Sequence, residues 1–279
     1  MKKSTRTIYG AALAAAQRTK EPLAILPNST LNEKFDVFKN ELPGTDEMPL
    51  VAYLAIGLNG RVMELTANGL YKSTPREYEP SWASLLKHIP FIVRPVTEDL
   101  TASERANYRM RRVELHDGVK YACYYLRKQD LSAHPLRVEK RVVINGVVTS
   151  QAWTPSLSDL NPVPLSPNPN QVMTTGNDYL SVSKKVPVVF TPTEIQEIMN
   201  GCNIIYGSPD YANVSEMAVV SGIERTLVGD FNGTARDYVE VIYAQVCDFV
   251  KTFFSCPDSL DGATVNLDIG SNEPLLTLS

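Results

Sequence analysis

Three two-residue turn sequences, each placed between apolar, β-branched runs, constrain the fold of this chain more than any other feature. They are Asn59-Gly60, Asp117-Gly118 and Asn145-Gly146. A type I′ turn needs positive φ at both central residues, which Asn-Gly and Asp-Gly tolerate best. The pattern therefore predicts three β-hairpins and a mainly antiparallel sheet. The predicted strand pairs are 50–58 with 61–67, 108–115 with 119–127, and 136–144 with 147–153.

Helix starts are indicated by capping boxes, in which a threonine and a glutamate three residues later satisfy each other's backbone donors. Such boxes open at Thr30, Thr74 and Thr191. A fourth and longest helix is expected where apolar residues follow a 3.6-residue period. The predicted helices are 30–42, 74–89, 191–201 and 235–254, and further strands are predicted over 179–190, 214–220 and 263–269.

A proline-rich stretch divides the chain. Five prolines between residues 154 and 170 favour extended backbone and exclude a helix or a central strand. The stretch is either a domain linker or a strap laid across a neighbour. The sequence thus predicts an α+β fold: an extended N-terminal arm over 1–29, a β-rich domain of antiparallel hairpins with short helices over 30–153, the proline-rich linker or strap over 154–175, and an α+β domain over 176–279.

The charges are distributed unevenly along the chain. Residues 1–185 hold 24 lysines and arginines against 18 acids, whereas residues 186–279 hold 3 against 13, so a net charge of −4 hides a basic front and an acidic back. Such a molecule can attract copies of itself head to tail. Contacts between two different surfaces close into rings or propagate as filaments. The polarity therefore favours an assembly subunit.

Motifs for chemistry are missing from the sequence. It contains no GxxxxGK[ST] loop, no GxGxxG and no GxSxG element. Its four cysteines form no CxxC pair, and its three histidines lie far from them without ligand-like spacing. No apolar run reaches the roughly 18 residues of a membrane span. We therefore expect no enzyme, no catalytic residue, no cofactor, no metal and no membrane partner.

A basic cluster interleaved with tyrosines lies between Arg105 and Arg141. Arginine and tyrosine are enriched in protein interfaces. Alternate residues of a strand point to opposite faces, which divides these cations between two sides of a sheet and favours a solvated sheet or a protein interface over a nucleic-acid groove. The predicted interface residues are Lys2, Lys3, Arg6 and Arg18 in the arm, Arg105, Arg109, Arg111 and Arg112 in the cluster, and Asp230, Asp237 and Glu240 as their acidic partners.

Three stretches, 178–183, 214–222 and 238–245, give the chain a texture that resembles virion structural proteins of large tailed bacteriophages. That resemblance implies a non-enzymatic protein present in many copies around a symmetric particle, at the neck or collar where head and tail join. It also implies terminal arms and straps, other virion proteins as partners, and assembly in the host cytoplasm. It implies no catalytic residue.

These features together support one main hypothesis and several alternatives. The main one is a homo-oligomeric ring at the head–tail connector, neck or collar of a virion, held by contacts between basic and acidic surfaces. A baseplate, tail-tube or capsid-decoration component is a variant of the same hypothesis. The alternatives from other classes are a nucleic-acid-binding accessory protein that uses the basic front, and an enzyme of a family without a recognisable motif.

Overall fold

The computed structural model describes residues 4–162, 173–231 and 234–278. The protein is mainly antiparallel β with few helices. It divides into two compact units: the first combines residues 1–130 with 189–265, and the second combines 131–188 with 266–279. Lys2 and Lys3, predicted as interface residues, lie outside the described residues, as do residues 163–172 of the proline-rich stretch. In its described part, residues 157–160 form a short helix between the prolines, so the prediction that this stretch excludes a helix is wrong there.

The elements alternate short helices with strands of very different length. The helices are α1 (Ile8–Thr19), α2 (Leu31–Phe35), α3 (Ala102–Arg105), α4 (Leu157–Leu160) and α5 (Pro192–Tyr206). The strands are β1 (Ser4–Arg6), β2 (Leu50–Gly57), β3 (Arg61–Leu65), β4 (Tyr71–Pro75), β5 (His88–Ile89), β6 (Ile92–Pro95), β7 (Tyr108–His116), β8 (Val119–Lys128), β9 (Arg137–Ile144), β10 (Val147–Ala152), β11 (Met173–Phe190), β12 (Asn213–Phe231), β13 (Thr234–Ser255) and β14 (Ala263–Leu278).

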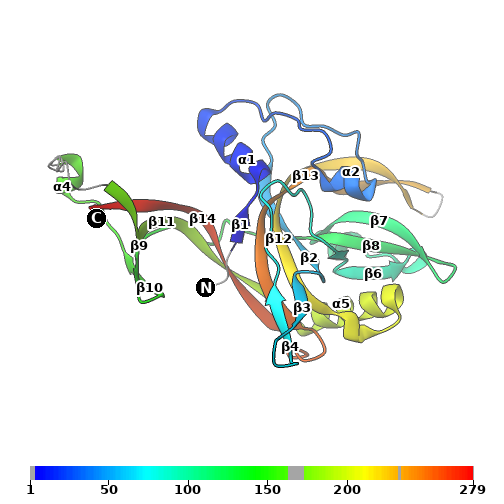
Figure 1. The fold of residues 1–279 in the computed structure, drawn as a ribbon. Helices are drawn as coiled ribbons and strands as arrows, with labels where there is room; N and C mark the ends of the chain where they lie inside the picture. Colours follow the sequence, from blue (N-terminus) through cyan, green and yellow to red (C-terminus); the bar gives the residue numbers. More distant parts are fainter. Residues whose placement is uncertain (1–3, 163–172, 232–233, 279) are drawn as a thin grey trace. The chain divides into compact units, whose positions relative to one another are not determined.

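The first unit is built on an eight-stranded antiparallel sheet. Its strands follow the order β1-β13-β12-β2-β8-β6, with β5 added beside β2 and β7 beside β8 (Figure 1). The long hairpin of β12 and β13 pairs Asn213 with Ser255 at one end and Phe231 with Thr234 at the other, and it is interrupted by three register shifts. The separate β3–β4 ribbon also belongs to this unit.

The helix predicted over 235–254 is wrong, because these residues form β13. The side chains from Glu240 to Cys247 are all buried, so apolar residues occur on both faces of the strand. A strand buried on both faces reads as a continuous apolar run rather than as an alternation. A 3.6-residue stripe can be drawn through such a run, but the β-branched and aromatic residues favour a strand.

Two predictions around the first turn sequence are also wrong. Strand β2 pairs with β12, β8 and β5, whereas β3 pairs with β4, so no hairpin forms about Asn59-Gly60. Gly60 instead lies so close to the Ser215 carbonyl that a Cβ would overlap it. No helix follows Thr74, which is the penultimate residue of β4, and the Glu77 carboxylate forms an ion pair with Lys251 instead of capping a helix.

The other two turn sequences behave as predicted. Asp117-Gly118 joins β7 to β8 and Asn145-Gly146 joins β9 to β10, and all four residues have positive φ. The boxes at Thr30 and Thr191 cap α2 and α5 as expected. Helix α2 is shorter than predicted, and α5 continues past Asn200-Gly201 to end at Gly207 in the left-handed conformation.

The N-terminal segment and the predicted domain boundary both differ from expectation. Residues 8–19 form α1 on the chain's own sheet, where the Thr7 hydroxyl donates to the Val246 carbonyl over 2.6 Å. Strand β2 from the first predicted domain pairs with β12 from the second. A boundary over 154–175 therefore does not coincide with the observed units, because non-local strand pairing joins segments that the prolines separate in sequence.

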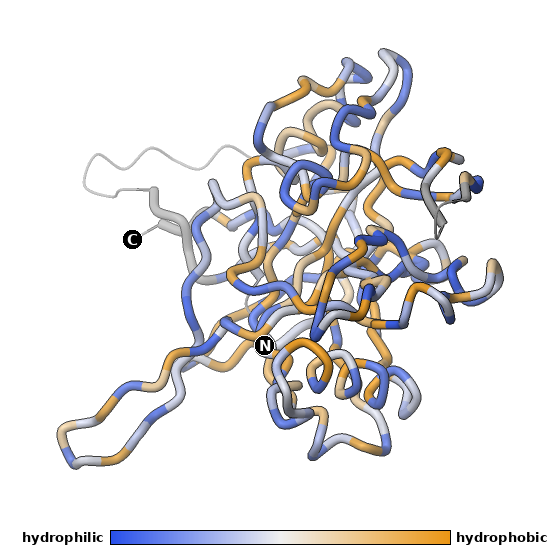
Figure 2. Tube along the Cα trace, turned by 90° about the vertical axis from the view of Figure 1, so that its right-hand side faces the viewer, coloured by the Kyte–Doolittle hydropathy of each residue, from blue (hydrophilic) through white to orange (hydrophobic). Residues whose placement is uncertain are grey.

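The first unit holds a large apolar core. Buried residues from α2, β2, β7, β8, β12 and β13 form one cluster, with Phe35 stacked on Tyr125 at a ring separation of 4.3 Å. Hydrophobic and hydrophilic residues are interspersed along the chain trace (Figure 2). Among the described residues, no helix combines the length and the apolar character needed to cross a membrane.

The second unit is a four-stranded sheet in the order β10-β9-β11-β14. Its described buried side chains include the polar residues Glu139, Arg141, Ser181 and Ser183. Arg141 forms ion pairs with Asp268 and Glu139, and Glu139 also pairs with Lys185 over 2.7 Å. Ion pairs thus occupy positions of this sheet where apolar side chains usually pack.

Candidate functional site

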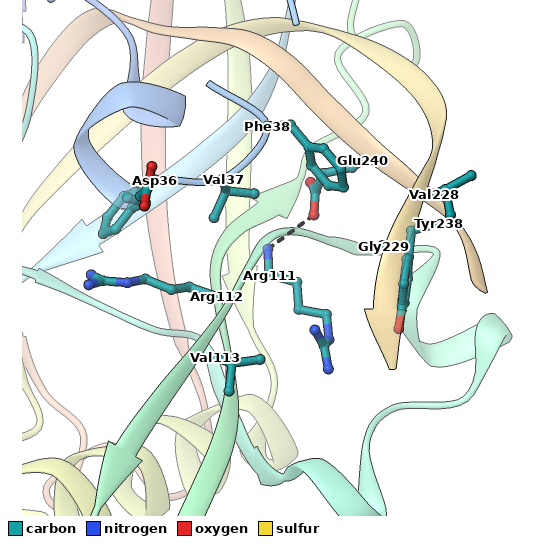
Figure 3. A pocket seen from close by; sticks show the side chains of 11 residues that line it. Asp36, Val37, Phe38, Arg111, Arg112, Val113, Val228, Gly229, Tyr238 and Glu240 are labelled. Atoms are coloured by element: carbon teal, nitrogen blue, oxygen red, sulfur yellow. Dashed lines mark hydrogen bonds between the residues drawn. The ribbon is translucent and has the colours of Figure 1, made fainter. Parts of the chain in front are cut away.

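A cavity of about 600 Å³ in the first unit collects several of the predicted interface residues (Figure 3). Strands β7, β12 and β13 and the segment following α2 supply its walls. Two arginines, one glutamate and three aromatic rings make its lining partly charged and partly aromatic. The lining residues are Phe35, Asp36, Val37, Phe38, Arg111, Arg112, Val113, Val228, Gly229, Tyr238 and Glu240.

Glu240 shapes the floor of this pocket. Its buried carboxylate accepts hydrogen bonds from the backbone N–H groups of Met110 (2.7 Å), Arg111 (3.0 Å) and Val241 (2.8 Å). Burial raises the pKa of Glu240, and these three donors oppose the rise. Met110 has φ +57°, which turns its N–H out of the strand ladder and toward the carboxylate. The glutamate thus fixes an irregular stretch of β7.

Arg111 follows directly and points along the wall of the pocket toward Tyr238 (Figure 3). Its Nε donates to Asp99 over 2.8 Å, and its Cζ lies 5.5 Å from the centre of the Tyr238 ring. The side chain is 91% buried. Among the described residues, no atom accepts a hydrogen bond from its Nη2. The pocket therefore contains a buried guanidinium with an unused donor.

Arg112 lies on the other side of the strand, toward Asp36 (Figure 3). Its side chain is 44% exposed, so it remains accessible to a ligand. Asp36 is paired with Lys39 over 2.7 Å, which offsets its negative charge. Arg105 stacks on Tyr238 at 4.4 Å from the ring centre. The arrangement suits a carboxylate or phosphate group, which arginines bind through paired N–H donors.

The basic front and acidic back neutralise each other in part inside one chain. Ion pairs link Arg94 to Glu197, Arg109 to Glu224, Arg127 to Glu194, Lys128 to Glu224, and Arg141 to Asp268. Each joins a cation of the first 185 residues to an acid beyond residue 190. Part of the sequence polarity is therefore neutralised within the chain, because the fold places front and back strands side by side.

The predicted interface residues have different environments. Arg109 and Glu240 are buried, so they offer no surface to a neighbouring subunit, and Arg111 is nearly so. Arg105 is half-buried, whereas Arg6, Arg18, Arg112 and Asp237 are exposed. The side chain of Asp230 lies outside the described residues. The structure thus brings Arg111, Arg112 and Glu240 together in one pocket. The arm residues Arg6 and Arg18 do not line this pocket.

Sequence reasoning missed a second surface, on the second unit. All six residues of the edge strand β10 are exposed. Apolar side chains of this unit face solvent, including Ile144 at 60% and Val147 at 64% exposure. An edge strand presents unpaired backbone groups that can pair with another chain. The sequence signal is the set of apolar residues on both sides of Asn145-Gly146, which predicts a hairpin but does not tell whether its outer strand is covered.

The fold and these surfaces define a mainly antiparallel β protein that combines an arginine-lined pocket with an exposed apolar edge strand. The whole chain, residues 1–279, matches a family described as a family of unknown function (DUF7208), and the chain belongs to this family. No curated protein and no solved structure matches it.

Proposed function

We propose that this protein is a structural subunit of a tailed-bacteriophage virion that assembles with copies of itself into a symmetric ring at the neck, collar or head–tail connector. One observation carries the proposal: the second unit is a sheet with ion pairs in its interior and a fully exposed edge strand that begins with Val147 and Val148. Small sheets need a hydrophobic face or a packed neighbour for stability. A neighbouring subunit would supply that cover.

Two unlike surfaces on one chain suit head-to-tail contacts. The β10 edge offers apolar side chains and backbone hydrogen bonds, whereas the pocket offers the exposed guanidinium of Arg112 to an acidic side chain of a neighbour. A heterologous contact of this kind generates a ring when its rotation closes. The resemblance of 178–183, 214–222 and 238–245 to virion structural proteins supports placing such a ring in a phage particle.

Size-exclusion chromatography with light scattering, at low and high salt, tests the assembly. We expect an oligomer whose mass falls when Val147 is replaced by lysine, because a charge on an edge strand opposes pairing. The matched control is Leu115→Lys, which alters an equally exposed apolar residue of the first unit. A monomer at every concentration, or equal loss in both variants, contradicts the proposal.

The pocket contact has its own test. Arg112→Glu reverses an exposed charge in the pocket, and Lys120→Glu does so at an exposed position of β8 outside it. We expect only Arg112→Glu to weaken assembly, and we expect high salt to mimic it because salt screens exposed charges. An electron-microscopy map of the virion would then show the chain's position; absence of the protein from purified particles would refute the virion assignment.

A further inference from the structure

One cluster of metal-ligating side chains lies outside the pocket, on the hairpin of β7 and β8. Glu114 and His116 come from β7, and Cys123 comes from β8. One donor atom from each residue, a carboxylate oxygen, an imidazole nitrogen and the thiol sulfur, lies within 4.8 Å of the other two. These are three of the atom types that proteins use to bind zinc.

The hairpin register explains why these residues meet. Glu114 and His116 are two residues apart, so they share a face of β7. In the pairing Arg112 lies opposite Cys123 and Glu114 opposite Tyr121, which places Cys123 diagonally across from Glu114. The spacing 114, 116 and 123 matches no familiar zinc motif. Only the turn at Asp117-Gly118 brings the histidine and the cysteine together.

We propose that Glu114, His116 and Cys123 form a binding site for a divalent transition-metal ion, with zinc as the best match. Bond lengths of about 2.0 to 2.3 Å place tetrahedral donors about 3.5 Å apart. Glu114 Oε2 and His116 Nε2 are already 3.2 Å apart. Small rotations of these two partly exposed side chains toward the Cys123 thiol, which the sheet holds in place, bring all three donor atoms to that separation.

Neighbouring side chains hold the carboxylate in a suitable orientation. The Tyr125 hydroxyl donates to Glu114 Oε1 over 2.6 Å, and Arg112 Nη1 lies 3.5 Å from the same oxygen. Oε1 is therefore occupied, and Oε2 is the oxygen that faces His116. Carboxylate ligands of metals are characteristically hydrogen-bonded in this way by residues that do not touch the ion.

The charge balance also fits a divalent cation. A thiolate and a carboxylate together neutralise the two positive charges of the ion, the imidazole stays neutral, and the thiol proton leaves to solvent. Glu114 and His116 keep 17% and 20% of their side-chain surface exposed, so the ion can enter and a water can take a fourth position. A mixed oxygen, nitrogen and sulfur donor set suits zinc or cobalt better than calcium or magnesium.

Cobalt(II) titration of the tag-free full chain tests the site, because a cobalt–thiolate bond gives a charge-transfer absorption in the near ultraviolet. We expect one equivalent to bind with that absorption and zinc to displace it. Cys123→Ser should abolish the band, and His116→Gln and Glu114→Gln should reduce affinity below detection. Tyr125→Phe, which removes only the supporting hydrogen bond, should weaken binding about 10- to 100-fold.

Matched controls separate this site from other binding. Cys202→Ser changes another buried cysteine, and His134→Gln changes a histidine outside the hairpin, so both should bind like the parent protein. Zinc should raise the melting temperature of the parent and of both controls but not of Cys123→Ser, since a ligand stabilises the state that binds it. The proposal fails if cobalt gives no thiolate band, or if the control variants lose binding as Cys123→Ser does.

Discussion

Glu240 on β13 accepts a 2.7 Å hydrogen bond from the backbone N–H of Met110 on β7, a residue with φ +57°. Positive φ is costly for a residue with a long side chain. The buried carboxylate stabilises that conformation and holds the next N–H, of Arg111, at the same time. The irregular stretch of β7 that carries the pocket arginines therefore depends on one glutamate from a distant strand.

Replacing Glu240 should destabilise the fold. Glu240→Ala leaves three buried N–H groups without an acceptor, so we expect a loss of about 3 kcal/mol in the free energy of unfolding. Glu240→Gln keeps one oxygen and should lose less. The control Asp237→Ala removes an exposed acid from the same strand and should change stability by less than about 0.5 kcal/mol. Urea unfolding measures all three, and an unchanged midpoint for Glu240→Ala would contradict this account.

Asn32 should stabilise another irregular part of β13, around Tyr243. Its side-chain amide donates to the Val241 carbonyl over 2.9 Å and accepts from the Ala244 N–H over 2.8 Å, on either side of Tyr243, which has φ +50°. Asn32→Ala leaves both groups buried and unpaired, which should cost about 2 kcal/mol. Asn40→Ala, on the exposed segment after α2, is the control and should be neutral in thermal unfolding.

Stability should fall in mild acid because of His88. Burial lowers the pKa of His88 to about 3 from 6.5. Below pH 6.5 the unfolded chain binds a proton that the folded chain does not bind, so the folded state loses up to about 1.4 kcal/mol per pH unit down to its own pKa. We expect the unfolding free energy of His88→Gln to depend less steeply on pH between 6.5 and 4 than that of the parent.

Chemical denaturation at a series of pH values measures the effect of His88. The imidazole Nε2 accepts from the Leu85 N–H over 3.1 Å, and glutamine can keep that bond while removing the titration. His134→Gln serves as the control and should retain the slope of the parent. Parallel pH profiles for the parent and His88→Gln would show that this histidine does not set the acid sensitivity.

Gly10 should be needed to hold the N-terminal helix on the sheet. A Cβ at this position of α1 would overlap the backbone of Cys247 on β13. Backbone atoms of a central strand cannot yield easily, so Gly10→Ala should cost about 1 to 3 kcal/mol or release the helix. Limited proteolysis should then cleave near residues 20–30 faster. Ala15→Ser, an exposed change on the same helix, should leave the cleavage rate unaltered.

Local signals in the sequence determined the turns and the helix starts. Asp117-Gly118 and Asn145-Gly146 specify their hairpins because few other residue pairs tolerate two positive φ angles. The boxes at Thr30 and Thr191 specify helix starts because both partners lie within one turn of backbone. These features depend on neighbours in sequence, but the same signals at Asn59-Gly60 and Thr74 gave no hairpin and no helix, because contacts with distant segments prevailed there.

Tertiary structure decided which segments pair and which side chains meet, because these features depend on contacts between distant segments of the chain. Residues 235–254 suit a helix or a strand by pattern, and only the neighbouring β1 and β12 select the strand. Asn59-Gly60 does not form a turn; instead it allows Ser215 to come close to the backbone and accept a hydrogen bond from the Gly60 N–H. Part of the charge polarity of the chain is neutralised by internal ion pairs such as Arg109–Glu224. Contacts more than a hundred residues apart carry no local signal, so the pocket emerges only from the folded chain. The Glu114–His116–Cys123 cluster, in contrast, follows from the register of one local hairpin.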